Sequence, residues 1–184
     1  MWRKRALDDA SVPRYMLLPP NCFFRAMSSV KKTEIATFAN GCFWGTEHMF
    51  RKHFGGKGLI NAKVGYIGGN KSIPKPTYKQ VCTGTTGYAE AAQIEFDPSS
   101  VSYAELVEFF YRTHDPTQVG GQGPDMGDQY RSALFPHTQE QTDIAQKVTS
   151  EVQAKHFNPH GTRIVTQIQM AKPEDLYVLY RSLH

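Results

Sequence analysis

A cysteine stands where a predicted strand meets a predicted helix. Residues 35–39 are apolar or small, and the Asn40-Gly41 pair that follows them is typical of a tight turn. Cys42 comes next. Phenylalanines follow at positions 43, 50 and 54, which are offsets of seven and eleven from the first. This spacing places all three on one helix face. The pattern predicts a buried strand, a glycine turn, and a helix that begins at or just after Cys42.

A cysteine at the start of a helix can act as a nucleophile. The first helical turn has unpaired N–H groups and a partial positive charge, and both stabilise a thiolate over a thiol. The alternative is a small buried residue without a chemical role, as most free cysteines are. Gly41 and Gly45 favour the reactive interpretation because they leave the sulfur sterically open. Phe43 and Trp44 would then form an apolar, aromatic surround for it.

A carboxyl that keeps its proton would complement a nucleophilic sulfur. Glu90 lies near the start of a predicted strand and is flanked by alanines and Tyr88. Apolar surroundings raise the pKa of a carboxyl, so Glu90 is the candidate acid. An exposed strand glutamate without a role is the alternative. Glu47 is a rival acid, but five residues after Cys42 on a helix we expect it to serve that helix's own first turns.

Two tyrosines and an aspartate are further candidates. Tyr78 and Tyr130 offer phenolic O–H donors, and Asp125 lies in the loop that precedes Tyr130. Taken alone, each tyrosine fits an ordinary, partly buried residue better than a catalytic one. The histidines show no metal-ligand spacing, so no metal site is expected. No protease-type motif surrounds the cysteine, which argues against a Cys–His protease.

Strand and helix patterns alternate along the chain. Periodicity and stop signals predict strands at residues 35–39, 59–67, 89–96, 132–135 and 162–170. Capping boxes that begin at Ser102 and Thr138 predict two further helices, and a short last helix is expected within residues 172–183. Residues 115–130 form a long loop rich in Gly, Gln and Asp, of a length that is often functional. The fold class is therefore α/β or α+β, a mixed sheet packed with helices.

Length and composition fit one globular domain. The chain has 184 residues, of which 40% are hydrophobic and 21% charged. Residues 1–40 hold seven Lys/Arg and three Asp/Glu, whereas residues 41–184 hold fourteen of each, so the net charge of +4 belongs to the N-terminal part. This balance predicts no nucleic-acid groove in the folded part. No apolar run approaches the ~20 residues of a membrane helix, so no membrane attachment is predicted.

Residues 1–32 are predicted to be an N-terminal extension, and residues 33–184 the catalytic domain. The extension is basic and has no sustained period, which favours a disordered tail. A mitochondrial targeting peptide is the other interpretation, and Asp8 and Asp9 argue against it because such peptides avoid acidic residues. Three cysteines are too few for a disulfide scaffold and fit a reducing compartment, which predicts a cytoplasmic protein.

Five segments match one set of motifs in the same order. They are N-G-C-F-W-G-x-E at 40–47, G-Y-x-G-G at 65–69, P-T-Y-x-x-V-C-x-G-x-T-G-x-A-E at 76–90, H-D-P-T at 114–117 and Q-G-x-D-x-G-x-Q-Y-R-S at 122–132. Together they resemble the signature of the peptide methionine sulfoxide reductase A family. The resemblance spans roughly residues 34–168 and is highly specific.

The resemblance implies a single domain with a ferredoxin-like α+β core and long active-site loops. It implies reduction of methionine S-sulfoxide, free or in oxidised proteins, by attack of a cysteine thiolate on the sulfoxide sulfur. The resulting sulfenic acid would be reduced by thioredoxin or another external thiol, with no bound cofactor or metal, in a monomer. The roles carried over are nucleophile for Cys42, proton donor for Glu90, ligands of the sulfoxide oxygen for Tyr78 and Tyr130, support of the site for Asp125, and contact with the substrate methyl group for Phe43 and Trp44.

The C-terminal end departs from the family pattern. Family members usually carry an aromatic Phe-Tyr-x-Ala-Glu-Asp-Tyr-His segment, often followed by resolving cysteines, whereas residues 172–180 keep only part of it. No cysteine follows Cys82, whose position the family treats as structural, and Cys22 lies in the extension. This truncated C-terminus predicts a one-cysteine cycle closed by an external thiol, with resolution by Cys22 or Cys82 as the alternative.

Two other functions stay open at this point. A catalytically weakened relative would act as a thiol redox sensor or a sulfoxide-binding module, which the shortened C-terminus motivates. A cysteine hydrolase outside the family would cleave an ester or an amide instead. Sulfoxide turnover that disappears in the Cys42→Ser variant would distinguish the reductase from both.

Overall fold

The computed structural model of the protein describes residues 32–181, and strands and helices alternate within them. The strands are β1 (Glu34–Asn40), β2 (Leu59–Ile67), β3 (Ala89–Phe96), β4 (Gly121–Gln122), β5 (Asp125–Met126), β6 (Ser132–Phe135), β7 (Gln167–Ile168) and β8 (Tyr177–Arg181). The α-helices are α1 (Phe43–Phe54), α2 (Tyr78–Cys82), α3 (Tyr103–Arg112) and α4 (Gln139–Val152). Shorter helical turns are η2 (Asp128–Tyr130), η3 (Gln153–Phe157), η4 (Asn158–His160) and η5 (Pro173–Asp175). Apart from Lys32, the predicted extension lies outside the described residues.

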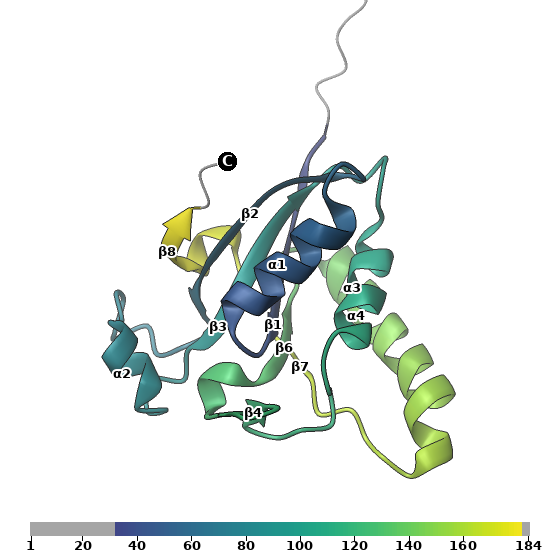
Figure 1. Ribbon diagram of the computed structural model, residues 1–184. Helices are drawn as coiled ribbons and strands as arrows, with labels where there is room; N and C mark the ends of the chain where they lie inside the picture. The colour runs from purple at the N-terminus through teal and green to yellow at the C-terminus, as the bar shows by residue number, and fades with distance from the viewer. Residues whose placement is uncertain (1–31, 182–184) are drawn as a thin grey trace, which may run out of the picture. The chain divides into compact units, whose positions relative to one another are not determined.

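Six of the strands make one mixed sheet in the order β7-β6-β1-β3-β2-β8 (Figure 1). The pairs are antiparallel, except that β6 and β7 run parallel. The chain order β1-α1-β2-β3-α3-β6 with the spatial order β6-β1-β3-β2 is the ferredoxin-like arrangement. The predicted α+β class is therefore confirmed. The central strands β1 and β3 are the two that carry the turn before Cys42 and the Glu90 side chain.

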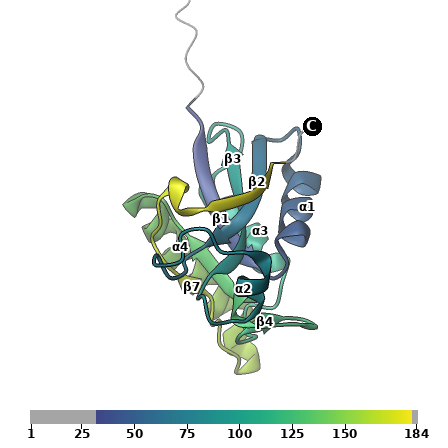
Figure 2. The same cartoon turned by 90° about the vertical axis from the view of Figure 1, so that its left-hand side faces the viewer.

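One face of the sheet is packed against α1 and α3. Because side chains alternate along a strand, Phe38, Val64 and Ile94 point from β1, β2 and β3 into the same core. The ring of Phe38 stacks on Phe50 of α1, with centroids 4.8 Å apart, and on Phe110 of α3 at 5.7 Å. Figure 2 shows α1 and the C-terminal segment around η5 on opposite sides of the strands. The helix face predicted from Phe43, Phe50 and Phe54 points into this core.

The helix starts agree with the predicted capping residues, with one correction. At α3 the Glu105 N–H donates to the Ser102 hydroxyl at 3.2 Å, and the Ser102 N–H donates to the Glu105 carboxylate at 2.8 Å. At α4 the Gln141 N–H donates to the Thr138 hydroxyl at 3.1 Å, but the Gln141 amide nitrogen donates to the Ile35 carbonyl at 2.9 Å. The second predicted capping box is therefore only half formed, because the Gln141 amide oxygen accepts from the His137 N–H at 2.9 Å instead of from the Thr138 N–H.

Two predictions for the C-terminal part are wrong. The strand expected at residues 162–170 is a strand only at Gln167–Ile168, and the N–H of Val165 donates to the Pro116 carbonyl outside the sheet. The helix expected within residues 172–183 is a short 3-10 turn followed by β8, which pairs with β2. In both places pairing with distant segments overrides the local pattern, as is usual for edge strands.

The long loop at residues 115–130 has structure of its own. It contains the hairpin of β4 and β5 and the turn η2. The Gln118 amide nitrogen donates to the Gly123 carbonyl at 3.2 Å, and the Gly123 N–H donates back to the Gln118 amide oxygen at 2.7 Å. Such self-contained bonding allows a loop of this length to hold a side chain in a defined position.

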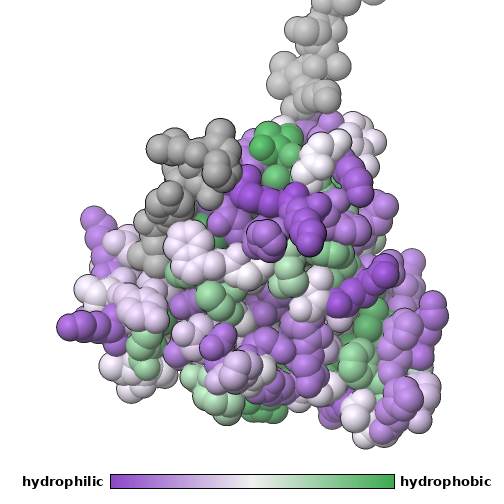
Figure 3. Space-filling model, viewed as in Figure 1, coloured by the Kyte–Doolittle hydropathy of each residue, from purple (hydrophilic) through white to green (hydrophobic). Residues whose placement is uncertain are grey.

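None of the helices in the described part of the chain is long and apolar enough to cross a membrane. On the face drawn in Figure 3, hydrophobic residues form small separate patches among hydrophilic ones. One patch lies at the β4–β5 hairpin, where Val119 and Met126 are exposed.

Candidate active site

Cys42 lies where the chain leaves β1 and enters α1. β1 ends at Asn40, Gly41 has a φ of +104°, and Cys42 is the N-cap of α1. The Cys42 carbonyl accepts hydrogen bonds from the N–H groups of Gly45 at 3.0 Å and Thr46 at 3.2 Å, which closes the first turn. The cysteine is a free thiol and half-buried. The predicted strand, glycine turn and helix start are therefore confirmed.

Hydrogen bonds hold this turn against the end of α3. The Thr46 hydroxyl donates to the Asn40 amide oxygen, and the Asn40 amide nitrogen donates to the Thr113 hydroxyl at 3.2 Å. Thr113 donates in turn to the Phe110 carbonyl at 2.9 Å. Asn40 and Thr46 are buried, so water does not compete for these bonds. The start of α1 is thereby fixed with respect to the rest of the core.

Glu90 meets α1 at its first residue. The Phe43 N–H donates to the Glu90 carboxyl oxygen Oε2 at 3.1 Å, across 47 positions of sequence. Glu90 is only 2% exposed and lies on the same face of β3 as Ala92 and Ile94, the face that α1 covers. The carboxyl is therefore beside the helix start that Cys42 caps.

Burial raises the pKa of Glu90 to about 7, against the hydrogen bond from the Phe43 N–H, which lowers it. The negative charge of Asp125 adds to the increase. Glu90 therefore holds its proton over much of the range below neutral pH, which is the state that a proton donor needs.

Glu47, the rival acid, is engaged elsewhere. Its carboxylate accepts a hydrogen bond from the Arg51 Nε at 2.9 Å, one turn further along α1. The Arg51 Nη2 also donates to the Ala62 carbonyl of β2 at 2.8 Å. Glu47 therefore pairs with a cation that joins α1 to the sheet, and not with the first turn of the helix as the sequence led us to expect.

Tyr78 and Tyr130 reach the site from separate segments. Tyr78 opens α2, and Tyr130 ends η2. A hydrogen bond to the Cys82 side chain raises the pKa of Tyr78 to about 12, and the neighbouring Tyr130 adds to the increase. Burial, followed by the Glu90 carboxylate, raises the pKa of Tyr130. Both phenols therefore keep their protons near neutral pH and can donate hydrogen bonds.

The remaining predicted residues lie around the same helix start. Phe43 is 5% exposed, and its ring meets Trp44 edge-on with centroids 5.3 Å apart. Trp44 is 48% exposed, so its indole borders the solvent. Asp125 is an exposed residue of β5, and its negative charge raises the pKa of Glu90. The structure thus gathers one acid, two phenols, an aromatic pair and a second carboxylate at one end of the sheet.

Tyr66 belongs to this group, and the sequence did not single it out. It is fully buried in β2 and lies directly opposite Glu90 in the β2–β3 register. Its ring stacks on Phe43 with centroids 5.9 Å apart. Only the pairing of the two strands reveals this neighbour, because Tyr66 and Glu90 belong to different motifs. A strand tyrosine beside glycines gives no other signal in the sequence.

A family model described as peptide methionine sulfoxide reductase matches residues 34–178. The chain belongs to the peptide methionine sulfoxide reductase family. A probable peptide methionine sulfoxide reductase of Schizosaccharomyces pombe is 47% identical over 152 residues, which cover 80% of this chain and 87% of that protein. The MsrA of Saccharolobus solfataricus is 42% identical over 151 residues, which cover 82% of this chain and 78% of that one. The protein is therefore an oxidoreductase that acts on methionine sulfoxide.

Solved structures support the same assignment for the fold of this reductase. The reduced form of Mxr1 from Saccharomyces cerevisiae matches with a TM-score of 0.67 and 39% identity, over 79% of this chain and 84% of that chain. Methionine sulfoxide reductase A of Corynebacterium diphtheriae matches with a TM-score of 0.69 and 33% identity, over 79% and 68% of the two chains. Mxr1 in complex with Trx2 also matches, with a TM-score of 0.56 and 32% identity over 77% and 78% of the chains.

Histidines in the reductase have structural surroundings. Burial lowers the pKa of His114 to about 4, so this side chain is neutral. Its ring contacts the Phe110 carbonyl at 2.8 Å and the Ser132 hydroxyl at 2.7 Å, which links α3 to β6. Within residues 32–181 we find no group of His, Cys, Asp and Glu that could hold a metal ion.

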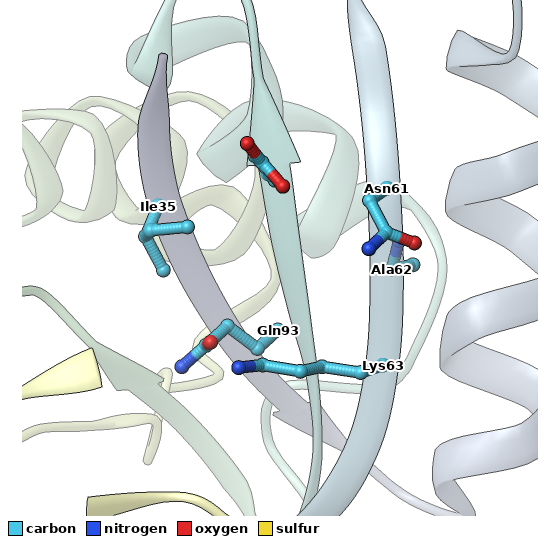
Figure 4. Close-up of a pocket in the computed structure, with 6 residues that line it drawn as sticks. Ile35, Asn61, Ala62, Lys63 and Gln93 are labelled. Carbon is cyan, nitrogen blue, oxygen red and sulfur yellow. The ribbon is translucent and has the colours of Figure 1, made fainter. Parts of the chain in front are cut away.

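A separate cavity lies on the opposite face of the sheet (Figure 4). Its volume is about 190 Å³, and its lining residues are Ile35, Asn61, Ala62, Lys63, Gln93 and Glu95. In Figure 4 the side chains of Lys63 and Gln93 extend in the same direction, and the Lys63 amine ends beside the Gln93 side chain. Gln93 also donates to the Pro173 carbonyl at 3.0 Å. None of the residues around α1's start lines this cavity, so it is separate from the candidate site.

Proposed function

We propose that this reductase moves the oxygen of methionine S-sulfoxide onto the sulfur of Cys42. The Cys42 thiolate attacks the substrate sulfur and forms an S–S bond, while Glu90 gives its proton to the sulfoxide oxygen and the S–O bond breaks. The hydroxide released then bonds to the Cys42 sulfur, which breaks the S–S bond and frees the thioether of methionine. The products are methionine and a cysteine sulfenic acid, so the substrate sulfur gains two electrons and the Cys42 sulfur loses two. Glu90 is left as a carboxylate and takes its next proton from solvent.

The observation that carries this proposal is the hydrogen bond from the Phe43 N–H to Glu90 at 3.1 Å. It puts a buried carboxyl within one residue of the half-buried thiol at a helix start. The pKa of about 7 supports the role of Glu90, because an oxide ion is a poor leaving group and needs an acid that is protonated near neutral pH. General acid catalysis of this kind contributes roughly 10²- to 10⁴-fold to a rate.

We assign substrate binding to the groups around this pair. Tyr78 and Tyr130 donate hydrogen bonds to the sulfoxide oxygen, which their raised pKa values support. Phe43 and Trp44 hold the substrate methyl group against aromatic carbon, as their edge-on packing suggests. Asp125 supports the site through its effect on Glu90. Tyr78 and Trp44 are exposed by 58% and 48%, which suits a site that accepts methionine sulfoxide in a protein as well as free.

An external dithiol completes the proposed cycle. Two thiol groups reduce the sulfenic acid to the Cys42 thiol and leave as a disulfide, with the oxygen released as water. Thioredoxin is the proposed source, because the similar Mxr1 has been crystallised with Trx2. The cycle is of the one-cysteine type, and Cys82, which is exposed and bonded to Tyr78, takes no part in it.

The test is a single turnover without reductant. The protein is mixed with excess of a peptide that contains methionine S-sulfoxide, and methionine and lost thiols are counted. We expect one equivalent of methionine, one thiol lost and a sulfenic acid on Cys42 by mass spectrometry. The Cys42→Ser variant should form none, and the R epimer should not react. Glu90→Gln should slow the step about 100-fold or more.

Each other outcome contradicts part of the proposal. One equivalent of methionine with two thiols lost, and a disulfide between Cys42 and Cys22 or Cys82, would exclude the one-cysteine cycle. Sulfenylation of Cys42 by peroxide without any turnover would favour the redox-sensor function instead. Methionine formation by Cys42→Ser would remove Cys42 as the nucleophile.

A further inference from the structure

The hydroxyl of Tyr66 is buried without a hydrogen-bond partner in the described part of the chain. The residue is 0% exposed. A buried hydroxyl that lacks a partner costs stability, and a phenylalanine of the same shape would avoid that cost. Such a group in a folded protein needs an explanation, and a bound water molecule and a part in catalysis are two of them.

The strand register places Tyr66 beside the proposed acid. Tyr66 and Glu90 are directly opposed in the β2–β3 pair, so their side chains leave the same face of the sheet. Phe43 touches both residues, because its ring stacks on Tyr66 and its N–H donates to Glu90. Burial raises the pKa of Tyr66, and the Glu90 carboxylate is the next cause of the increase. The Tyr66 phenol is therefore a neutral donor that lies within the electrostatic reach of Glu90.

The groups around Glu90 leave its ionised form with few donors. From α1 it receives the Phe43 N–H, next to the Cys42 thiol, while from β5 it faces the negative charge of Asp125. From η2 it faces the Tyr130 phenol. Glu47 on α1 is already paired with Arg51, which adds no free cation. Cys82 and Tyr78 of α2 raise the pKa of the Tyr66 phenol.

We propose that Tyr66 is a positioning residue for Glu90, whose hydroxyl donates through one water molecule to the carboxylate that forms when the sulfoxide oxygen takes the proton. The inference rests on the proposed role of Glu90 as the acid. No bond is made or broken by Tyr66 itself, since the proton moves from Glu90 to the substrate oxygen. The hydroxyl stabilises the charge that Glu90 acquires and so tunes its proton affinity toward neutral pH.

The structure offers a matched pair of variants. Tyr103 is also a buried tyrosine, 4% exposed, whose hydroxyl has no partner in the described residues. It opens α3 after the far end of β3, and its ring stacks on Phe38 instead of Phe43. Tyr66→Phe and Tyr103→Phe each remove one hydroxyl and keep the ring. They therefore differ in whether the lost hydroxyl faces Glu90.

The measurement is the pH dependence of the single-turnover rate of methionine formation, without reductant. In Tyr66→Phe the carboxylate loses a donor, so the pH at which the rate falls on the alkaline side should rise by about one unit. The acidic side should stay in place, and Tyr103→Phe should match the parent throughout. Thermal unfolding of both variants verifies that the fold is kept.

Two results would overturn the inference. One is an alkaline limb of Tyr66→Phe that coincides with that of the parent. The other is an equal displacement in Tyr103→Phe, which would mean that any buried hydroxyl has this effect. A parent protein that forms no methionine at all would contradict the proposed function itself, which separates the two failures.

Discussion

Glu90 is subject to two opposing effects, and burial is the stronger one. Removal from water disfavours its charged form, whereas the Phe43 N–H stabilises that form, and the balance is a pKa raised to about 7. The helix start that attracts negative charge thus holds a carboxyl that keeps its proton.

The raised pKa of Glu90 makes stability depend on pH. Its ordinary value is 4.5 and its value in the fold about 7, so the folded state binds the proton more tightly. This stabilisation is fully present below pH 4.5 and is lost as the pH rises through about 7. Relative to Glu90→Gln, the parent should lose about 2 kcal/mol of unfolding free energy between pH 5 and pH 8, with solvent screening allowed for. Urea denaturation at the two pH values measures this difference.

Glu105→Gln is a control of opposite sign. The hydrogen bond from the Ser102 N–H lowers the pKa of Glu105, so its stabilisation is present above the ordinary value and lost as the pH falls. Unfolding free energies measured at pH 3 and pH 5 should therefore show the parent gaining stability relative to Glu105→Gln as the pH rises, whereas between pH 5 and pH 8 their difference should stay nearly constant. If the unfolding free energies of the parent and of Glu90→Gln changed in parallel at all pH values, that result would contradict the buried, protonated state of Glu90.

At the scale of elements, the junction of β1 and α1 depends on Gly41. Its φ of +104° lies in the region that side chains with a Cβ rarely adopt. A Cβ there would also lie 3.0 Å from the Cβ of Gln122, in the β4–β5 hairpin. The sequence suggested that Gly41 leaves the sulfur open. The structure shows a second reason, since the glycine lets β1 turn into α1 while the hairpin packs on the turn.

Gly41→Ala should destabilise the protein by about 1 to 3 kcal/mol, because it strains this turn. It should also lower the single-turnover rate, since Cys42 is the next residue. Gly45→Ala is the matched control for stability. A Cβ at Gly45 meets no atom within 4 Å, and alanine favours a helix by up to about 1 kcal/mol over glycine. Urea denaturation should give opposite signs for the two variants, and equal losses would contradict a special role of Gly41.

At the scale of the whole molecule, Arg131 joins the segments that surround the site. It is 6% exposed and follows Tyr130 directly. Its guanidinium donates to the Gly87 carbonyl at 3.1 Å, the Gln167 side chain at 3.1 Å and the Asp128 carbonyl at 3.0 Å. It thus connects η2 with β7 and with the turn that leads into β3. Arg131 therefore helps to hold η2, which ends at Tyr130, against the start of β3.

Arg131→Met should cost about 2 to 4 kcal/mol, because it leaves several buried acceptors without a donor. It should also weaken substrate binding, seen as a higher KM, since η2 carries Tyr130. Arg112→Met is the control, because Arg112 and Glu108 form an exposed pair at 3.9 Å that is worth less than about 1 kcal/mol. Urea denaturation and steady-state kinetics with dithiothreitol measure both effects. Similar losses in the two variants would contradict the connecting role of Arg131.

Much of the fold followed from local patterns in the sequence, whereas the roles expected of Tyr78, Tyr130 and Asp125 came from the resemblance to the reductase family. The strands at 59–67, 89–96 and 132–135 have the predicted bounds, and α1 begins after Cys42 as predicted. The amide of Gln141 and strand β8 did not follow from such patterns. The Gln141 nitrogen bonds to the distant Ile35 carbonyl while its oxygen accepts from the His137 N–H, which leaves the capping box half formed. Pairing with β2 replaced the expected helix with β8.

The sequence by itself determined where most of the strands and helices lie and that Cys42 stands at a helix start, because period and capping depend on residues within about four positions of one another. Only the tertiary structure decided that Glu90 meets the start of α1 and that Tyr66 lies beside it. Both contacts require β2 and β3 to pair and α1 to cover their shared face. The burial that keeps a proton on Glu90 near neutral pH arises from that assembly, since no short segment can exclude water from a carboxyl on its own.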